Sequence, residues 1–282
     1  MKGLITEDLC YRYDSSGFSL QNVNIEIGGG EFVLVTGPSG CGKSTLAYCL
    51  SGVIPHCIKS GEMKGRVIVN GKDTRTTELN KLVRDVGIVL QNPESQIFGM
   101  TVEEDIAFGL ENVCLPPSTI REKVDEVLSF IGLENARAKN PYQLSGGEKQ
   151  RLVIGSVLAM DPSILILDEP FSNIDSLGAE TVLSTLVSLK NAGKTVVLIE
   201  RRSEYVISFV DRIIALEDGG VVADTNPRSF FKNRKLVEEL DINLPQVVRL
   251  AYKLEESGVK MGDVPLTVEE LVSDLNGSYN RN

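Results

Sequence analysis

The 282 residues of this chain, 42% of them hydrophobic, suffice for one large globular domain and a small appendage. A formal net charge of -10 argues against a nucleic-acid partner, because nonspecific nucleic-acid binding depends on clustered Lys and Arg side chains. Five cysteines without a C-x-x-C spacing argue against a disulfide framework or a structural zinc site, and no run approaches the ~20 apolar residues that span a bilayer, so membrane association is expected only through a partner.

Strand and helix patterns alternate along the first 228 residues. Residues 3–27 alternate polar and apolar side chains and predict antiparallel strands, and a second β-rich piece covers 65–72. The segments that follow are strands at 86–90, 164–167 and 195–199, and helices at about 118–131 and from about 147. This order predicts an α/β fold with a mostly parallel sheet, preceded by an antiparallel β subdomain. The only histidine, His56, is expected in a loop without a catalytic role.

The strongest motif follows an apolar stretch at 31–36. The pattern G-x-x-x-x-G-K-[ST] is complete here and predicts a phosphate-binding loop, with a helix starting near Lys43. Glycines let such a loop wrap closely round phosphates, and its N–H groups and the helix end attract the anion. Lys43 is expected to neutralise the β- and γ-phosphates, and Ser44 to bind Mg²⁺. The candidate nucleotide-binding residues are Gly37, Pro38, Ser39, Gly40, Cys41, Gly42, Lys43, Ser44 and Thr45.

Two carboxylates follow the apolar run at 164–167. Asp168 and Glu169 come directly after this predicted strand, at the edge where open α/β sheets bind ligands. Asp168 fits a Mg²⁺ ligand, and Glu169 fits a general base or water-orienting group in phosphoryl transfer. An exposed acidic turn is the plain alternative, which the phosphate loop upstream disfavours.

A second glycine-containing loop, Leu-Ser-Gly-Gly-Glu-Lys-Gln at 144–150, opens a helix and can also present N–H groups to phosphate. This segment resembles the signature sequence of ABC-type ATPases and lies 24 residues before Asp168, as in that family. The resemblance implies a P-loop NTPase fold of ABC type, with a helical subdomain at about 92–160, that binds ATP and Mg²⁺. It also implies that two such domains pair head to tail. Ser145, Gly146 and Gly147 would then act on the partner's nucleotide.

Three further residues match functional positions of that family. Gln91 matches the glutamine loop, which reaches Mg²⁺ and the attacking water and senses a transmembrane partner. Asp175 matches the loop that links the two nucleotide sites. Tyr13 matches the aromatic position that stacks on adenine, although an aromatic residue in a strand more often serves ordinary packing.

Arg201 departs from the family pattern. The strand at 195–199 is followed by Glu200 and then Arg201, where family members usually carry a histidine. A guanidinium does not titrate near neutral pH, but it can hold a γ-phosphate. Two hypotheses follow: Arg201 supports hydrolysis in a different way, or the chain contributes a weakened site to an asymmetric pair. The sequence alone leads us to prefer the second.

The segment after Gln91 narrows the resemblance to the energy-coupling factor (ECF) importers, which take up vitamins and transition-metal ions. In that group an ATPase pair on the cytoplasmic face of the cell membrane binds a transmembrane coupling subunit, which holds a substrate-binding membrane protein. The resemblance implies a groove for a coupling helix, with Glu94 as the acidic partner of an arginine. The candidate groove residues are Glu94, Gln96, Ile97 and Phe98.

Residues 229–282 resemble the C-terminal extension of the same group and are expected to serve dimerisation or regulation, next to an ABC-type domain at 1–228. Thr267 and Glu270 fit a capping box at the start of a helix. Apolar residues also recur on one predicted helical face, at Val247, Leu250, Ala251 and Leu254. The function expected is ATP hydrolysis that energises an ECF-type importer. The alternatives are a soluble ABC-type ATPase and a nucleotide-binding subunit with little turnover.

Overall fold

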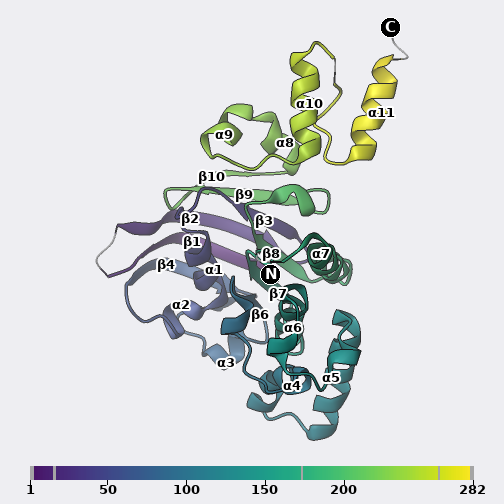
Figure 1. Cartoon of the computed structure of the whole chain (residues 1–282). Coiled ribbons are helices and arrows are strands. Elements are labelled where there is room, and N and C mark those ends of the chain that lie inside the picture. The colour runs from purple at the N-terminus through teal and green to yellow at the C-terminus, as the bar shows by residue number, and fades with distance from the viewer. Residues whose placement is uncertain (1–2, 15–16, 173, 260, 280–282) are drawn as a thin grey trace.

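The computed structural model describes residues 3–14, 17–172, 174–259 and 261–279, so four residues of the predicted extension, 260 and 280–282, lie outside it. Figure 1 shows a central sheet with a group of helices at one end and the C-terminal helices at the other. The phosphate loop and the carboxylates Asp168 and Glu169 belong to the central part, whereas the signature loop opens α6 (Gly146–Leu158) in the group of helices at one end.

The central sheet confirms the mostly parallel arrangement predicted from the sequence. Within the described ranges it has six strands in the order β10-β9-β3-β8-β7-β6, of which only β10 runs antiparallel to its neighbour. Parallel strands bring their carboxyl ends to one edge, which is where ligands bind. The strands are β3 (Phe32–Thr36), β6 (Val86–Val89), β7 (Ile164–Asp168), β8 (Thr195–Ile199), β9 (Arg212–Glu217) and β10 (Gly220–Thr225).

A separate antiparallel sheet covers one face of the central sheet. In the described part of the chain it has the order β2-β1-β4-β5, as the alternating pattern at the N-terminus predicts. Its strands are β1 (Gly3–Arg12), β2 (Phe18–Gly28), β4 (Glu62–Val69) and β5 (Lys72–Asp73), and the helices beside them are α1 (Lys43–Ser51), α2 (Val53–His56) and α3 (Leu79–Leu82). His56 therefore ends a short helix rather than lying in a loop, and its Nε2 is 2.7 Å from the carbonyl oxygen of Thr74.

Alternate residues of β3 enter two different hydrophobic cores. Val33 and Val35 pack with α1 and the antiparallel sheet, whereas Phe32 and Leu34 pack with the helices on the opposite face. Both faces of the strand are covered, which explains its continuous apolar sequence. The phosphate loop that follows Thr36 is thus attached to a strand that is buried along its whole length.

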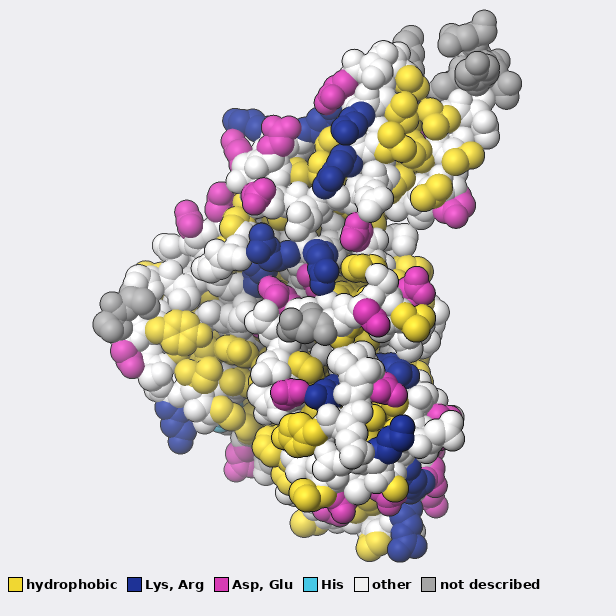
Figure 2. All heavy atoms as spheres, viewed as in Figure 1, with side chains coloured by type: hydrophobic (Ala, Val, Ile, Leu, Met, Phe, Trp, Pro, Cys, Tyr) yellow, Lys and Arg dark blue, Asp and Glu magenta, His cyan; other side chains and the backbone are white. Residues whose placement is uncertain are grey.

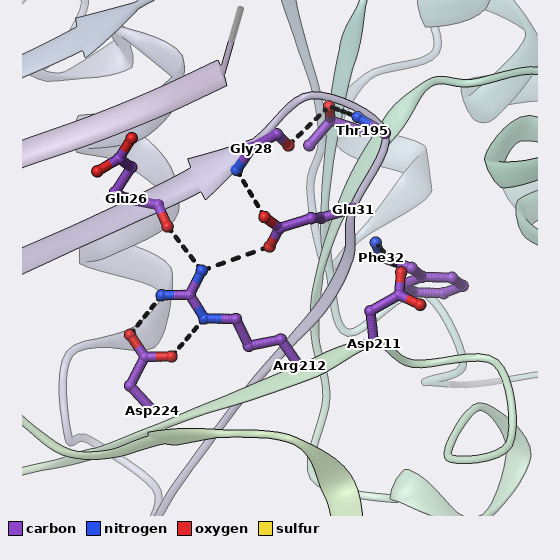
Figure 3. A network of polar contacts seen from close by, with 9 residues as sticks. Glu26, Gly28, Glu31, Phe32, Thr195, Asp211, Arg212 and Asp224 are labelled. Carbon is purple, nitrogen blue, oxygen red and sulfur yellow. Dashed lines mark hydrogen bonds and ion pairs between the residues drawn. The ribbon is translucent and has the colours of Figure 1, made fainter.

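An arginine network ties the two sheets together at the amino end of β3, away from the phosphate loop (Figure 3). Arg212 on β9 donates from Nη1 to the carbonyl of Glu26 on β2, at 2.7 Å, and from Nη2 to Asp224 on β10, at 2.6 Å. Glu31, just before β3, accepts from the N–H of Gly28 and lies 3.4 Å from the same guanidinium. The network therefore fixes the amino end of β3, opposite to the end that continues into the phosphate loop.

The helical subdomain consists of α4 (Val102–Asn112), α5 (Pro117–Ile131) and α6 (Gly146–Leu158). The carboxylate of Asp105 on α4 is 3% exposed and holds the subdomain to the loop after Gln91. One oxygen accepts from the N–H groups of Phe98 and Gly99 at 2.8 and 3.0 Å, and the other accepts from Ser156 Oγ on α6 at 2.8 Å. The segment at 98–99 and α6 are therefore linked through one buried side chain.

We expect Asp105→Ala to lower the free energy of unfolding by about 2–4 kcal/mol, because it leaves buried donors without acceptors. Asp105→Asn keeps one carbonyl oxygen and should cost less. Urea denaturation of both variants measures the difference. An alanine variant within about 0.5 kcal/mol of the unaltered chain would show that Asp105 does not anchor the subdomain.

The C-terminal extension packs beyond β9 and β10. It contains α8 (Pro227–Lys232), α9 (Arg234–Glu239), α10 (Gln246–Glu256) and α11 (Val268–Tyr279), and α7 (Ser176–Asn191) lies between it and the helical subdomain in the view of Figure 1. The predicted apolar face of α10 is only partly buried, since Ala251 is buried but Leu250 is 48% exposed. The other buried side chain of α10 is that of Val248, which is not among the predicted residues. Figure 2 shows apolar side chains gathered over α10 and α11.

The predicted start of α11 is capped by the two residues expected from the sequence. Thr267 Oγ1 accepts from the N–H of Glu270 at 3.2 Å. The carboxylate of Glu270 accepts from the N–H of Leu266, at 2.7 Å, and from the backbone of Thr267, and it pairs with Arg228 on α8. These contacts fasten α11 to the first helix of the extension.

Candidate active site

The phosphate loop runs from the end of β3 to the start of α1 and requires glycine at two crowded positions. Gly37 and Gly42 have φ of 140° and 104°, and a Cβ atom there would lie 2.1 Å from the carbonyl oxygen of Leu216 and 2.3 Å from that of Ser19. No larger residue fits without moving backbone. Lys43 Nζ lies across the loop and donates to the carbonyls of Gly37 and Pro38, at 2.8 and 2.7 Å.

The residues expected to hold Mg²⁺ meet at the carboxyl end of β7. Asp168 is 2% exposed, accepts a hydrogen bond from the side chain of Ser44, and has one carboxylate oxygen that is buried without a protein partner. Burial raises the pKa of the Asp168 carboxyl, an effect that the bond from Ser44 and the charge of Lys43 oppose. A buried carboxylate oxygen with a free ligand position beside a hydroxyl suits a hard divalent cation. These residues therefore fit a magnesium ion, which would draw charge from the phosphates of ATP.

Gln91 and Glu169 form a second pair at the same edge. Gln91, two residues beyond β6, donates from Nε2 to Glu169 Oε2 at 2.7 Å. The backbone of Glu169 is left-handed, with φ of 47°, and its N–H donates to the carbonyl of Ile199 at 2.9 Å. Left-handed backbone at a non-glycine residue is strained and often marks a functional position. The turn places a partly exposed carboxylate next to Asp168, where it could orient water.

Arg201 reaches the phosphate loop from β8. Its Nη1 donates to Ser39 Oγ at 3.0 Å. The preceding residue, Glu200, donates its N–H to the carbonyl of Val35 on β3, which fixes the start of the turn that carries Arg201. A permanent positive charge therefore lies against the loop expected to hold the phosphates.

Tyr13 borders the helix that follows the loop. Its hydroxyl lies 3.3 Å from Thr45 Oγ1, and its ring meets that of Tyr11 edge to face, with centroids 4.9 Å apart. Thr45 and Cys41 are buried, and burial raises the pKa of the Cys41 thiol. The adenine-stacking role of Tyr13 stays a prediction.

The signature loop lies at the start of α6, beside a hollow of about 370 Å³. Ser145 caps α6 in a reciprocal pair with Glu148, which also lowers the pKa of the Glu148 carboxyl. Asp175 caps α7 by accepting from the N–H of Gly178 at 2.8 Å. The hollow is lined by residues at the starts of both helices, among them Ser145, Gly146, Gly147, Asp175, Leu177 and Thr181. Two predicted loops, 30 residues apart in sequence, thus form one concave surface.

The predicted groove residues do not all face outward. Phe98 is 68% exposed and stacks on Phe108 of α4, with ring centroids 5.4 Å apart. Ile97 is 6% exposed and belongs to the hydrophobic core. The Gln96 side chain bonds to the backbone of β6 and of the residue that follows it, accepting from the N–H of Leu90 and donating to the carbonyl of Ile88. Gln96 and Ile97 therefore hold the segment from beneath, and a partner would meet Phe98.

Sequence reasoning missed two polar residues that connect these parts. Lys149 on α6 pairs with Glu94 at 2.5 Å, so the predicted acidic contact already has an internal partner. Glu200 is buried and accepts from the N–H groups of Arg201 and Arg202 with one oxygen. No local sequence pattern predicts these contacts. The Lys149–Glu94 pair joins distant segments that the fold brings together, and the bonds of Glu200 form within a single turn.

Comparisons with known proteins agree with this geometry. The ABC transporter family model matches residues 20–172, just over half of the chain. A putative ABC transporter ATP-binding protein of Pyrococcus horikoshii is 40% identical over 100% of this chain and 99% of its own length. An energy-coupling factor transporter ATP-binding protein of Clostridium novyi is 36% identical over 95% of this chain and 96% of its own.

Solved structures give the same fold. The cbiO1 protein of Clostridium perfringens, described as part of the ABC transporter complex cbiONQ, matches with a TM-score of 0.74 and 30% identity over 89% of this chain and 98% of its own. An ATP-binding cassette solved as a dimer with ADP and phosphate matches with a TM-score of 0.69 and 28% identity over 80% of this chain and 99% of its own. The chain belongs to the ABC transporter family of ATP-binding proteins and is an ATPase that uses Mg²⁺.

Proposed function

We propose that this chain energises an ECF-type importer of a vitamin or a transition-metal ion. It pairs head to tail with a second ATPase subunit, either a copy of itself or a homologous chain, on the cytoplasmic face of the cell membrane. A transmembrane coupling subunit and a substrate-binding membrane protein complete the assembly. The relatives named as an energy-coupling factor ATP-binding protein and as part of the cbiONQ complex support this assignment.

The head-to-tail pairing is supported by the separation of two phosphate-binding features. The hollow at the signature loop is lined by residues of α6 and α7 and by none of the phosphate-loop residues, within the part of the chain that the structure describes. A chain built this way supplies the phosphate loop of one site and the signature loop of another. In the proposed cycle, ATP closes the pair and hydrolysis opens it, which moves the membrane helices bound to it.

The observation that carries the membrane coupling is the short path from an exposed surface to the catalytic edge. Gln91 bonds directly to Glu169, and three residues further on Glu94 is half exposed, with Phe98 beyond it. A coupling helix that bears an arginine and an apolar side chain would engage Glu94 and Phe98 together. A displacement of this segment would also move Gln91. Asp105 would pass the same displacement to α6 and the signature loop.

We expect Glu94→Gln to weaken binding of a transmembrane coupling subunit about tenfold, because a charge-assisted bond becomes a neutral one. Co-expression with such a subunit from the same genome, followed by membrane extraction and affinity measurement, tests this. Glu122→Gln, on the exposed face of α5, is the matched control and should have no effect. Lys149→Ala should not weaken binding, since it frees Glu94.

If the unaltered chain shows no affinity for any coupling subunit, the runner-up applies and the chain is a soluble ABC-type ATPase. If it binds but Glu94→Gln binds equally well, the membrane role stands and the assignment of Glu94 fails. The first result therefore tests the proposed membrane function, and the second tests only the Glu94 contact.

The Arg201–Ser39 contact bears on the two hypotheses for the missing histidine. It holds a guanidinium against the loop that is expected to bind the phosphates of ATP, which supports a direct role of Arg201 in hydrolysis. We therefore now favour the first hypothesis, and a weakened site becomes the alternative.

We expect Arg201→Ala to lower the ATP hydrolysis rate about 100-fold, as for loss of one preorganised donor to the transition state, and Arg201→Lys to lower it less. Steady-state hydrolysis at saturating ATP measures both. If the alanine variant keeps the original rate, the site does not use Arg201, and the alternative of a degenerate site with little turnover gains support.

A further inference from the structure

The C-terminal extension contacts the turn that follows β8. The segment between α9 and α10 pairs with the turn that follows β8: Asn243 and Arg202 form an isolated parallel β-bridge. Ser203, which is buried, donates from Oγ to the carbonyl of Asn243 at 3.3 Å. Forty residues of chain separate the two sides, so the contact is a tertiary one.

The same turn carries Arg201. The carboxylate of Glu200 accepts from the N–H of Arg201 at 2.8 Å and from that of Arg202 at 3.0 Å, so one buried side chain shapes the turn. Arg201 then points to the phosphate loop, where it contacts Ser39. A shift of the turn by a fraction of an ångström would change that contact.

Arg202 makes a third connection. Its Nη2 donates to the carbonyl of Phe171 at 2.7 Å, two residues after Glu169. The side chain of Arg202 therefore ties the turn to the segment that leaves the catalytic carboxylates, while its backbone meets the extension. No other residue described in the structure is bonded to both.

We propose that Arg202 is a positioning residue that couples the C-terminal extension to nucleotide binding: through it, the extension senses ATP at the phosphate loop and holds Arg201 in place. The inference rests on the proposed role of Arg201. ATP that engages the Arg201 guanidinium fixes the 200–203 turn, and the turn fixes the segment at 241–244. Because α9 ends and α10 begins at this segment, both helices follow it.

Amide hydrogen exchange tests the coupling without relying on turnover. With Glu169→Gln present throughout to prevent hydrolysis, saturating Mg–ATP is expected to slow exchange in the 241–247 peptide about fivefold or more. A peptide from α11 (268–276) should change little. Arg202→Ala should abolish the slowing, and Arg202→Lys, which can still donate to Phe171, should restore part of it.

Two further variants keep the result unambiguous. Arg249→Ala, an exposed arginine on α10, is the matched control and should preserve the response. Ser203→Ala removes one hydroxyl that bonds to Asn243 and should also reduce the response. This variant tests the same contact if Arg202→Ala loosens the extension. Unchanged exchange at 241–247 on addition of ATP, or an equal response in Arg202→Ala, overturns the proposal.

Turnover then separates this inference from the proposed function. If Arg202 acts through Arg201, Arg202→Ala lowers kcat about tenfold with KM nearly unchanged, and adds nothing in the Arg201→Ala background. An additive effect in the double variant contradicts the coupling route. If Arg201→Ala itself has no effect on turnover, the assigned role of Arg201 fails, and only the exchange result decides on Arg202.

Discussion

Glu169→Gln is expected to reduce ATP hydrolysis by about 10²–10⁴-fold while ATP still binds. The amide cannot take a proton from the attacking water, but it preserves the size of the side chain and can still meet Gln91, which lies 2.7 Å from Glu169 Oε2. In the proposed cycle, the closed dimer should then persist, because hydrolysis is the step that would open it. Phosphate release and size-exclusion chromatography in the presence of Mg–ATP measure the two effects.

The control for this variant is Glu180→Gln, an exposed carboxylate on α7 that should leave turnover unchanged. Hydrolysis by Glu169→Gln within about threefold of the unaltered chain would remove Glu169 from the catalytic role, since loss of a general base costs far more. Loss of ATP binding in the same variant would instead point to damage at the phosphate loop.

Lys43→Ala is expected to abolish useful ATP binding. Lys43 is buried and lies across the phosphate loop, so its loss would leave the β- and γ-phosphates without the cation that is expected to neutralise them. Truncating one partner of a buried charge pair costs about 2–5 kcal/mol, which is roughly a 30-fold or larger rise in Kd. Isothermal titration with Mg–ATP measures it.

Lys59→Ala, an exposed lysine in the loop before β4, is the matched control. A Kd for Lys43→Ala within about threefold of the original value would contradict the phosphate loop assignment. The variant should still fold, because the crowded contacts of Gly37 and Gly42 are with the backbone of Leu216 and Ser19 and do not depend on the Lys43 side chain.

The sequence predicted the central architecture because its signals are local. The apolar runs of β3, β7 and β8 are buried on both faces, and the phosphate loop is bounded by glycines whose positions are sterically required. The predicted mostly parallel sheet and antiparallel subdomain are confirmed by the fold and by the solved relatives.

Contacts between distant segments could not be predicted in the same way. Leu250 shares a helical face with Ala251 by spacing, yet it is exposed, because which side of α10 is covered depends on how α8 and α9 pack. Ile97 and Gln96 point inward for a similar reason: the buried carboxylate of Asp105 and the backbone of β6 fix their segment. The roles of the individual site residues stay predictions.

The role of the 229–282 segment in dimerisation or regulation also stays a prediction. Its contact with the turn that carries Arg202 is a structural connection through which the proposed regulation of the ATP site would act. In the described residues, no helix is both long and apolar enough to cross a bilayer. The membrane proposal rests on the surface near Glu94 and Phe98.

In the proposed pair, two phosphate loops and two signature loops must come together for hydrolysis. We would therefore first measure the ATP hydrolysis rate of the purified chain over a wide range of protein concentration, with Glu169→Gln as the blank. We expect turnover to rise more than linearly with concentration and to vanish in the blank, with Arg201 in place of the usual histidine. ATP binding without turnover would show that the partner is a homologous chain rather than a second copy, whereas turnover strictly proportional to concentration, down to values at which the chain is monomeric, would contradict the requirement for pairing.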